Sequence, residues 1–353
     1  MTMIGVMVRY LALLAVILIG CDTPSGRVSP RNQPTGSLHA QALATLQVAT
    51  RSEQPLVRAN AIEMLEPEVE PLRDAVRRGL VDRNAGVRFV SAMALGKRRL
   101  CGSSELVRPL LDDPSQSVRA AAIFALVVCG DDDVDQTPLS AMVLGLDRVT
   151  RANAALVLGE IGNPTAAVLL REAMKRPLQV ENPEVVRASE LGLAEALVRL
   201  GDRRQLETIR AAFFAPASQG ELTALASQMA GRLSDRTLVP AMAALALATG
   251  PRQAGPELRL IAAEALARID RQMALPALAI EFSDSDMPEV RMQVAAVLGL
   301  DRSPEGERML ERLLGDPNER VRVAAAGAVL RRGDEPPAPA VVPSKSESLI
   351  LGD

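Results

Sequence analysis

Acidic side chains are the groups in this chain whose type and spacing could carry out acid–base chemistry. Four of them fall on segments with helical periodicity, where we expect them on a shared face: Glu63, Glu160, Glu195 and Glu264. Two carboxylates within about 10 Å of each other in a cleft could serve a hydrolase as acid and base. His39 is the only histidine, and the chain contains no Gly-rich phosphate loop, Ser-His-Asp arrangement or Cys-x-x-Cys. The sequence therefore predicts no catalytic residue set, no metal site and no cofactor.

Cys21 is the cysteine with the most specific surroundings. It directly follows an apolar run, residues 11–20, which is too short to span a bilayer as a helix and suits the core of a signal peptide. The tetrapeptide Leu18-Ile19-Gly20-Cys21 resembles the lipobox of bacterial lipoproteins, in which the cysteine thiol is lipidated and becomes the first mature residue. The resemblance implies a signal peptide over 1–20, a palmitate-bearing Cys21 and an extracytoplasmic position at a bacterial cell membrane. The alternative is an ordinary signal peptide, or an uncleaved anchor, with an incidental cysteine.

Composition excludes some classes of partner. The net charge is −3, with 40 basic and 43 acidic residues, so no global field attracts nucleic acid. Hydrophobic residues make up 48% of the chain but aromatic residues only 2%. The core must therefore consist of Ala, Leu and Val, which favours helices that approach one another closely.

A phrase close to Val-Arg-x-x-Ala-Ala-x-Ala-Leu recurs along the chain and sets the framework for these side chains. Its arginines are separated by 30, 31, 32, 36, 72, 32 and 31 residues, with Leu222-Thr223 at the midpoint of the longest step. The motif arginines are Arg58, Arg88, Arg119, Arg151, Arg187, Arg259, Arg291 and Arg322. A period near 32 with helical content predicts a stacked array of about nine units over residues 38–333.

Each unit reads as two helices. In the last unit a helix over 305–314 ends at Gly315-Asp316-Pro317, and a second helix follows to about residue 330. Capping residues precede the second helices, namely Asn84, Ser115, Asp147 and Asn318. Prolines suited to a first helical turn are Pro55, Pro256 and Pro288. The fold class that we predict is all-α, an α-solenoid of helical hairpins.

These features resemble the HEAT repeat in its short bacterial, HEAT-like form. The segments over 113–126 and 316–329, each with Asp-Pro followed by Val-Arg, carry the resemblance. It implies a scaffold, since the family is mostly scaffolds with a minority of enzymes. HEAT-like hydroxylases hold two irons with several His-Glu pairs, and HEAT-like DNA glycosylases use a basic, aromatic-bearing groove. This chain has neither, and the export signal argues against the HEAT-like bilin lyases.

The recurring arginines are interpreted as structural. An aspartate lies six residues before Arg88, Arg119 and Arg322. On a helical projection the arginine lies at the rim of the apolar face, where its guanidinium can bond the preceding turn. Small residues three positions after the arginine are predicted to be core: Ala61, Ser91, Ala122, Ala154, Ala226, Ala262 and Ala325. A ladder of binding arginines is the alternative.

An apolar patch is the predicted partner site. Positions one, two and five after the motif arginine point away from the core on the same projection. In units two to four they include Phe89, Val90, Met93, Phe124 and Leu156. An exposed apolar patch on a soluble array often marks a partner site. The alternative is that a neighbouring helix or the tail covers these side chains.

Cys101 and Cys129 are predicted to remain separate thiols. They are placed near the ends of second helices in neighbouring units, and stacked units lie about 10 Å apart. A disulfide requires Cα atoms within about 7 Å.

The function predicted from these observations is a non-catalytic, lipid-anchored scaffold or adaptor that binds an unknown protein or peptide. Its binding surface would be a concave face about 80–90 Å long, if the units stack 8–10 Å apart. No nucleic-acid or small-molecule substrate is evident. A flexible tether is expected over 21–37 and a disordered Pro/Ser-rich tail over 334–353. The alternatives are a carboxylate-dependent envelope hydrolase and a purely structural envelope component.

Overall fold

The computed structural model describes residues 36–65, 70–176, 178, 182–250 and 253–332. The predicted signal peptide, the predicted lipidation of Cys21, most of the predicted tether over 21–37 and the predicted tail over 334–353 lie outside these residues. Within the described part the chain contains helices and no strand, and it forms nine consecutive two-helix units. The prediction of an all-α solenoid is confirmed. No described helix is both long enough and apolar enough to cross a bilayer.

Each unit has a first and a second helix. The first helices are α2 (Gly36–Ala49), α4 (Glu70–Leu80), the 3-10 pair η1 (Cys101–Leu106) and η2 (Arg108–Asp112), α7 (Pro138–Leu144), α9 (Ala166–Lys175), α11 (Leu206–Phe213), α13 (Val239–Leu247), α15 (Pro276–Glu281) and α17 (Pro304–Leu314). The second helices are α3 (Pro55–Met64), α5 (Ala85–Lys97), α6 (Gln116–Val128), α8 (Arg148–Ile161), α10 (Pro183–Arg199), α12 (Gly220–Arg232), α14 (Pro256–Ile269), α16 (Pro288–Leu298) and α18 (Glu319–Arg331). Short 3-10 turns join some of them: η3 (Arg203–Gln205), η4 (Ala217–Gln219), η5 (Arg236–Leu238) and η6 (Arg271–Met273).

The second helices begin where their local chemistry predicts. The side chain of Asn84 accepts hydrogen bonds from the Gly86 and Val87 amides, and Asp147 and Asn318 cap α8 and α18 in the same way. Ser115 is the exception, because its side chain makes no capping bond to α6. Instead the Asp113 carboxylate accepts a bond from the Ser115 amide at 2.8 Å. Pro55, Pro256 and Pro288 each open a helix, as predicted.

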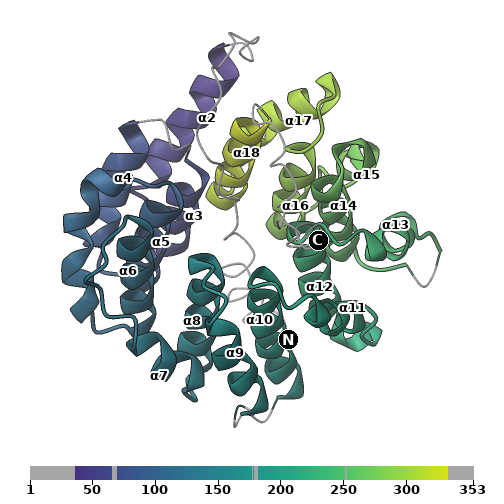
Figure 1. Cartoon of the computed structure of the whole chain (residues 1–353). Helices are drawn as coiled ribbons and strands as arrows, with labels where there is room; N and C mark the ends of the chain where they lie inside the picture. Colours follow the sequence, from purple (N-terminus) through teal and green to yellow (C-terminus); the bar gives the residue numbers. More distant parts are fainter. Residues whose placement is uncertain (1–35, 66–69, 177, 179–181, 251–252, 333–353) are drawn as a thin grey trace, which may run out of the picture.

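The nine units close into a ring (Figure 1). Helix α18 of the last unit packs against α2 and α3 of the first. Second helices such as α8, α10, α12 and α14 lie on the inner side, and first helices such as α9, α11, α13 and α15 lie on the outer side. The expectation of a concave face that runs about 80–90 Å from one end of the array to the other is therefore wrong, because the two ends meet. Consecutive units turn enough for the two ends of the array to cover each other.

The predicted small core residues are confirmed. All seven predicted small residues are 0% exposed, including Ser91, whose hydroxyl donates to the Val87 carbonyl at 2.7 Å. Small side chains at these positions allow the helices to approach closely. Gly231 of α12 illustrates this, because a Cβ there would lie 3.0 Å from the Cα of Ala265 in α14.

The predicted apolar patch is not an exposed surface. Phe89 and Val90 are 4% exposed and Met93 and Phe124 are 2% exposed, so the expectation of exposure is wrong for all four; Leu156 is partly buried. Neighbouring second helices pack side by side, and the Phe124 ring of α6 lies against Gly96 of α5. A helical projection of one hairpin assigns to the core only the side chains that face the other helix of that hairpin. Here the second helix of the adjacent unit covers a further side of the helix and buries these residues as well.

The two central cysteines form a disulfide, which corrects the prediction of separate thiols. Cys101 and Cys129 are bonded, with their Cα atoms 5.2 Å apart. Cys101 does not end a second helix: it begins η1, the first element of the third unit, and Cys129 directly follows α6, the second helix of that unit. Both residues therefore belong to one hairpin, and the spacing between stacked units does not apply to them.

Candidate functional site

The motif arginines join successive units. Arg88 donates from Nε and Nη2 to the two carboxylate oxygens of Asp113 at 2.7 and 2.9 Å, and from Nη1 to the carbonyl of Asp82 at 2.8 Å. Arg58 bonds Asp82 in the same bidentate way. Each aspartate is thus held by the arginine of the unit before it, while its carbonyl is bonded by the arginine of its own unit. Burial alone would raise the pKa of Asp113, but Arg88 outweighs this and lowers it.

The pattern varies around the ring. Arg291 repeats the bidentate contact with Asp316 at 2.7 and 3.0 Å, while Arg119 and Arg322 donate to carbonyls six residues earlier in the chain. Arg151 donates to the carbonyl of Ala173, Arg187 to the Gln219 side chain and Arg259 to the carbonyl of Ala246. These contacts are those that a structural arginine would make. Their importance for folding stays a prediction.

Charged side chains near the carboxyl ends of the second helices form a chain of alternating sign, which we call the inner charge belt. Lys97 Nζ lies 3.4 Å from Glu160 Oε1, which lies 3.7 Å from Arg199 Nη1. Arg199 Nη2 is 3.3 Å from Glu195 Oε1, and Arg232 binds both oxygens of Glu195 at 2.9 and 2.7 Å. The belt therefore connects α5, α8, α10 and α12 through side chains with little exposure to solvent.

Burial and the neighbouring charges shift the pKa values of the belt and of the adjoining Glu63. Burial raises the pKa of Glu63 to about 7, against the smaller opposing effects of Lys97, Arg98 and Arg331. Burial lowers the pKa of Lys97, and Glu160 and Glu63 oppose this. At Glu195 burial would raise the pKa, but Arg232 and Arg199 prevail and lower it to about 2.

The candidate carboxylates are only partly brought together. Glu160 and Glu195 contact opposite ends of one guanidinium, that of Arg199, so they satisfy the distance set for an acid–base pair. Both are engaged in ion pairs, however, and the strongly lowered pKa of Glu195 makes it a poor proton donor. Glu264 pairs with Arg268 of its own helix at 2.7 Å. Among the described residues no group of three or more His, Cys, Asp or Glu side chains is placed to hold a metal ion.

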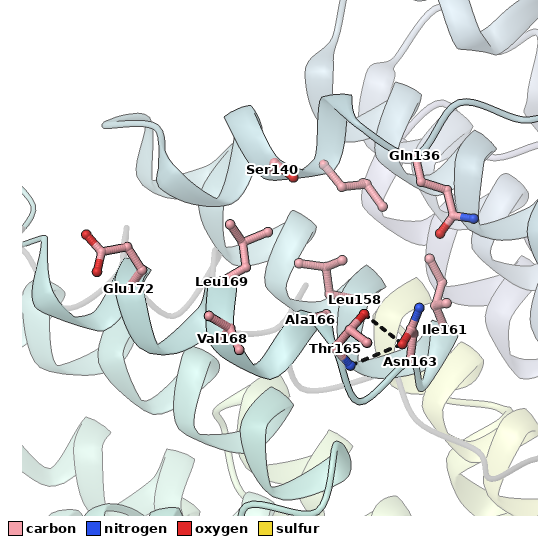
Figure 2. A pocket seen from close by; sticks show the side chains of 11 residues that line it. Gln136, Ser140, Leu158, Ile161, Asn163, Thr165, Ala166, Val168, Leu169 and Glu172 are labelled. Atoms are coloured by element: carbon pink, nitrogen blue, oxygen red, sulfur yellow. Dashed lines mark hydrogen bonds between the residues drawn. The ribbon is translucent and has the colours of Figure 1, made fainter.

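An open groove lies on the fourth and fifth units, between α7, the end of α8 and α9 (Figure 2). Its volume is about 460 Å³, within the range of ligand and peptide sites. Apolar side chains form its floor and wall: Leu139, Leu158, Ile161, Ala166, Val168 and Leu169. The polar members are Gln136, Ser140, Asn163, Thr165 and Glu172. Val168 is 69% exposed and lies beside the other apolar side chains of the groove.

Local sequence explains where the groove is. Helix α7 starts at Pro138 and spans only 7 residues, because an acidic loop takes up the chain before it. In Figure 2, Gln136 and Asn163 lie at one end of the groove and Glu172 lies at the other. The Asn163 side chain accepts bonds from the amide and the hydroxyl of Thr165, which orders the turn into α9. The groove is therefore built on ordered helix ends.

The repeats can now be compared with known proteins. A family model described as HEAT repeats matches residues 42–127, 103–194 and 275–344, which together exceed half of the chain. The chain belongs to the HEAT-repeat family. No curated protein sequence matches it. Among solved structures it is similar to human deoxyhypusine hydroxylase in complex with glycerol, at 16% identity and a TM-score of 0.35, over 85% of this chain and 99% of that one. A similarity this low carries no argument about function.

HEAT repeats generally mediate protein–protein interaction. The groove, which could serve such an interaction, was not predicted from the sequence. A usable signal was present in the fourth repeat, where the short first helix follows an acidic loop. The inner charge belt also had a signal. Charged residues recur nine positions after the motif position, at Lys97, Glu160, Arg232, Arg268 and Arg331.

Proposed function

We propose that this protein is a non-catalytic scaffold that binds another protein through the outer side of its HEAT-repeat ring. The groove between α7 and α9 supports this most directly, because it combines ordered helix ends, an apolar floor and the 69% exposed Val168. Exposed apolar surface of this kind is the usual anchor of a protein interface, where it is desolvated on binding. A partner would cover it.

The pairing of the inner carboxylates supports a non-catalytic role. Glu160, Glu195 and Glu264 each contact arginine or lysine at 3.7 Å or less, so their charges are already compensated inside the protein. A hydrolytic acid–base pair needs one carboxyl that carries a proton and one that does not. In the belt, Arg232 and Arg199 favour the ionised form of Glu195. Glu63 is the candidate that meets the first requirement, since burial raises its pKa to about 7, and the charged groups that oppose this are the cations Lys97, Arg98 and Arg331.

We further propose that the ring is exported and held to the extracytoplasmic side of a bacterial cell membrane by lipid on Cys21. The lipobox-like residues Leu18-Ile19-Gly20-Cys21 support this. Each buried methylene of an acyl chain contributes roughly 0.8 kcal/mol to membrane binding, so two or three chains give a stable anchor. A Cys101–Cys129 disulfide also suits an oxidising compartment.

Photocrosslinking in living cells tests the binding role. A photoreactive amino acid would replace exposed residues one at a time around the outer side, including Val168, Leu247 and Phe214. We expect a discrete crosslinked protein at some of these positions and none at the rest. A ring that captures no protein at any outer position would contradict the scaffold proposal.

The anchor has a separate test. Cys21→Ser should move the protein from the membrane fraction to the soluble exported fraction and remove the mass of the lipid from the amino-terminal peptide. An unchanged membrane fraction with Cys21→Ser would contradict lipid anchoring and leave the scaffold proposal standing.

A further inference from the structure

The loop that leads into the groove is strongly acidic. Residues 131–135 read Asp-Asp-Asp-Val-Asp, and Gln136, the next residue, lines the groove. Asp131 is bound by Arg108. The side chains of Asp132, Asp133 and Asp135 are exposed to solvent. The loop that enters one end of the groove at Gln136 therefore carries three exposed carboxylates.

Contacts hold two residues of this loop, Val134 and Asp135, in place. Asp135 accepts bonds from the amide and the hydroxyl of Thr137, both at 2.9 Å, and these bonds lower its pKa. The buried Val134 side chain, 8% exposed, attaches the loop to the core. The loop is thus held at Val134 and Asp135, next to the groove residue Gln136.

The opposite end has a different balance of charge. Glu172 lies there, and it pairs with Lys175 Nζ at 3.8 Å and with Arg176 Nε at 3.3 Å. Its charge is therefore already compensated by two cations of the same helix end. The groove has an acidic end at Gln136 and an end at Glu172 where basic charge is in excess.

We propose that the groove binds an amphipathic helical segment of a partner protein, whose aliphatic side chains enter the groove and whose basic end lies at the acidic loop. This deepens the proposed function and rests on it. Aliphatic residues spaced three and four apart would meet Leu158, Val168 and Leu169, as in other helix-in-groove interfaces. Lysine or arginine at one end of that helix would face Asp132, Asp133 and Asp135. A basic residue at a helix carboxyl end also complements the helix dipole, so the partner helix would point its carboxyl end toward Gln136.

Fluorescent synthetic peptides test this with the full-length protein. The probe is a helical peptide of about 14 residues, or four turns, with leucines on one face and lysines at its carboxyl end. A second peptide carries glutamates in place of the lysines. Fluorescence anisotropy should show binding of the lysine peptide at least about tenfold tighter than binding of the glutamate peptide. Raising the salt concentration should reduce this preference, because the charges at the acidic loop are exposed.

Matched variants locate the site. Val168→Asp should weaken the lysine peptide about tenfold or more, because it places a charge on the apolar wall. Val81→Asp is the control, since Val81 is an exposed valine on another unit, 81% exposed. Asp132→Asn, Asp133→Asn and Asp135→Asn together should abolish the preference for lysine while the leucine contacts remain. Glu305→Gln with Glu311→Gln, two exposed acids on α17, should leave it unchanged.

A photoreactive group at either end of the peptide reads the orientation. The carboxyl-terminal probe should crosslink to residues near Gln136 and the amino-terminal probe to residues near Lys175. The reverse pattern would overturn the orientation, and equal binding of both peptides would overturn the basic partner. Unchanged affinity in Val168→Asp would overturn the groove as the site.

Two other occupants give distinct results, each of which would overturn the proposal. If deletion of residues 334–353 strengthens peptide binding, the chain's own tail fills the groove. If the protein sediments as a dimer and Val168→Asp makes it a monomer, a second copy fills it. A partner crosslinked in cells at other outer positions, and unaffected by Val168→Asp, would leave the scaffold proposal intact while removing this one.

Discussion

Ser52, just after the first helix of the ring, donates a hydrogen bond of 2.9 Å to the carboxylate of Glu319 at the start of the last helix, across 267 residues of sequence. At the other end of α18, Arg331 Nη1 lies 2.9 Å from the sulfur of Met64. These contacts belong to the seam, which we define as the packing of α18 against α2 and α3. The seam turns a linear array into a ring, so stability is shared between units that a linear array would keep apart.

Gly327→Leu tests the seam. A Cβ at Gly327 would lie 2.5 Å from the sulfur and 3.0 Å from the Cβ of Met64, so the Met64 side chain would have to shift and the larger leucine would crowd the contact between α18 and α3. We expect a loss of about 1–3 kcal/mol in the free energy of unfolding. Small-angle X-ray scattering should show a larger radius of gyration. Gly192→Leu is the control, because Gly192 also lies on a second helix and a Cβ there meets nothing within 4 Å. Equal stability and size for both variants would mean that the ring does not depend on this contact.

The arginines should differ in their contribution to stability. Arg88→Ala removes a bidentate pair and leaves the 5% exposed Asp113 carboxylate without its arginine partner, which we expect to cost about 3 kcal/mol. Arg119→Ala removes a bond of 2.7 Å to a carbonyl, and about 1 kcal/mol is expected. Urea unfolding measures both. A stable Arg119→Ala protein that no longer binds its partner would reverse the structural interpretation.

Glu63 should make the protein less stable as the pH rises. Its pKa is about 7 in the fold and 4.5 in the unfolded chain, so the folded protein holds the proton between these values. The contribution of protonated Glu63 to the free energy of unfolding is fully present below pH 4.5 and is lost as the pH rises through 7. Glu63→Gln should therefore be about 1–3 kcal/mol more stable than the wild type at pH 8 and nearly equal to it at pH 5. Thermal unfolding at the two pH values gives the difference. The same offset at both would show that Glu63 does not titrate in this range.

The disulfide should stabilise the third unit. Cys101 and Cys129 close a loop of 28 residues. Such a crosslink lowers the conformational entropy of the unfolded chain and so adds about 3–4 kcal/mol to the free energy of unfolding. Cys101→Ala with Cys129→Ala should lose that amount, and a reducing agent should then have no further effect. Peptide mapping after alkylation without reduction should find both thiols protected. Alkylation of both in the oxidised, denatured protein would contradict the bond.

Much of the fold could be predicted from the spacing of a few residue types. Ala61 and Ala262 are small because helices touch there, and Asn84 and Asn318 begin helices because their side chains satisfy free amides. Such features act within one hairpin, so they are readable in one segment of sequence. The burial of Phe89 and Phe124 could not be predicted in this way, because the helix that covers them belongs to the neighbouring unit.

The site depended on distances that no single unit contains. Glu160 and Glu195 were recognisable as carboxylates on inner helices, but their pairing with Arg199 and Arg232 depends on how adjacent units are rotated. The groove likewise requires α7, α8 and α9 together, so it forms only where two adjacent units meet.

By itself the sequence determined that this protein is a series of two-helix units with an alanine-rich core, since helix periodicity, caps and repeat length are local properties. Only the tertiary structure decided that the series closes on itself, that Cys101 and Cys129 belong to one hairpin, and that the outer side is grooved at the fourth and fifth units. The physical reason is accumulation: a small rotation between neighbours, invisible in any one repeat, adds up over nine units until α18 meets α2.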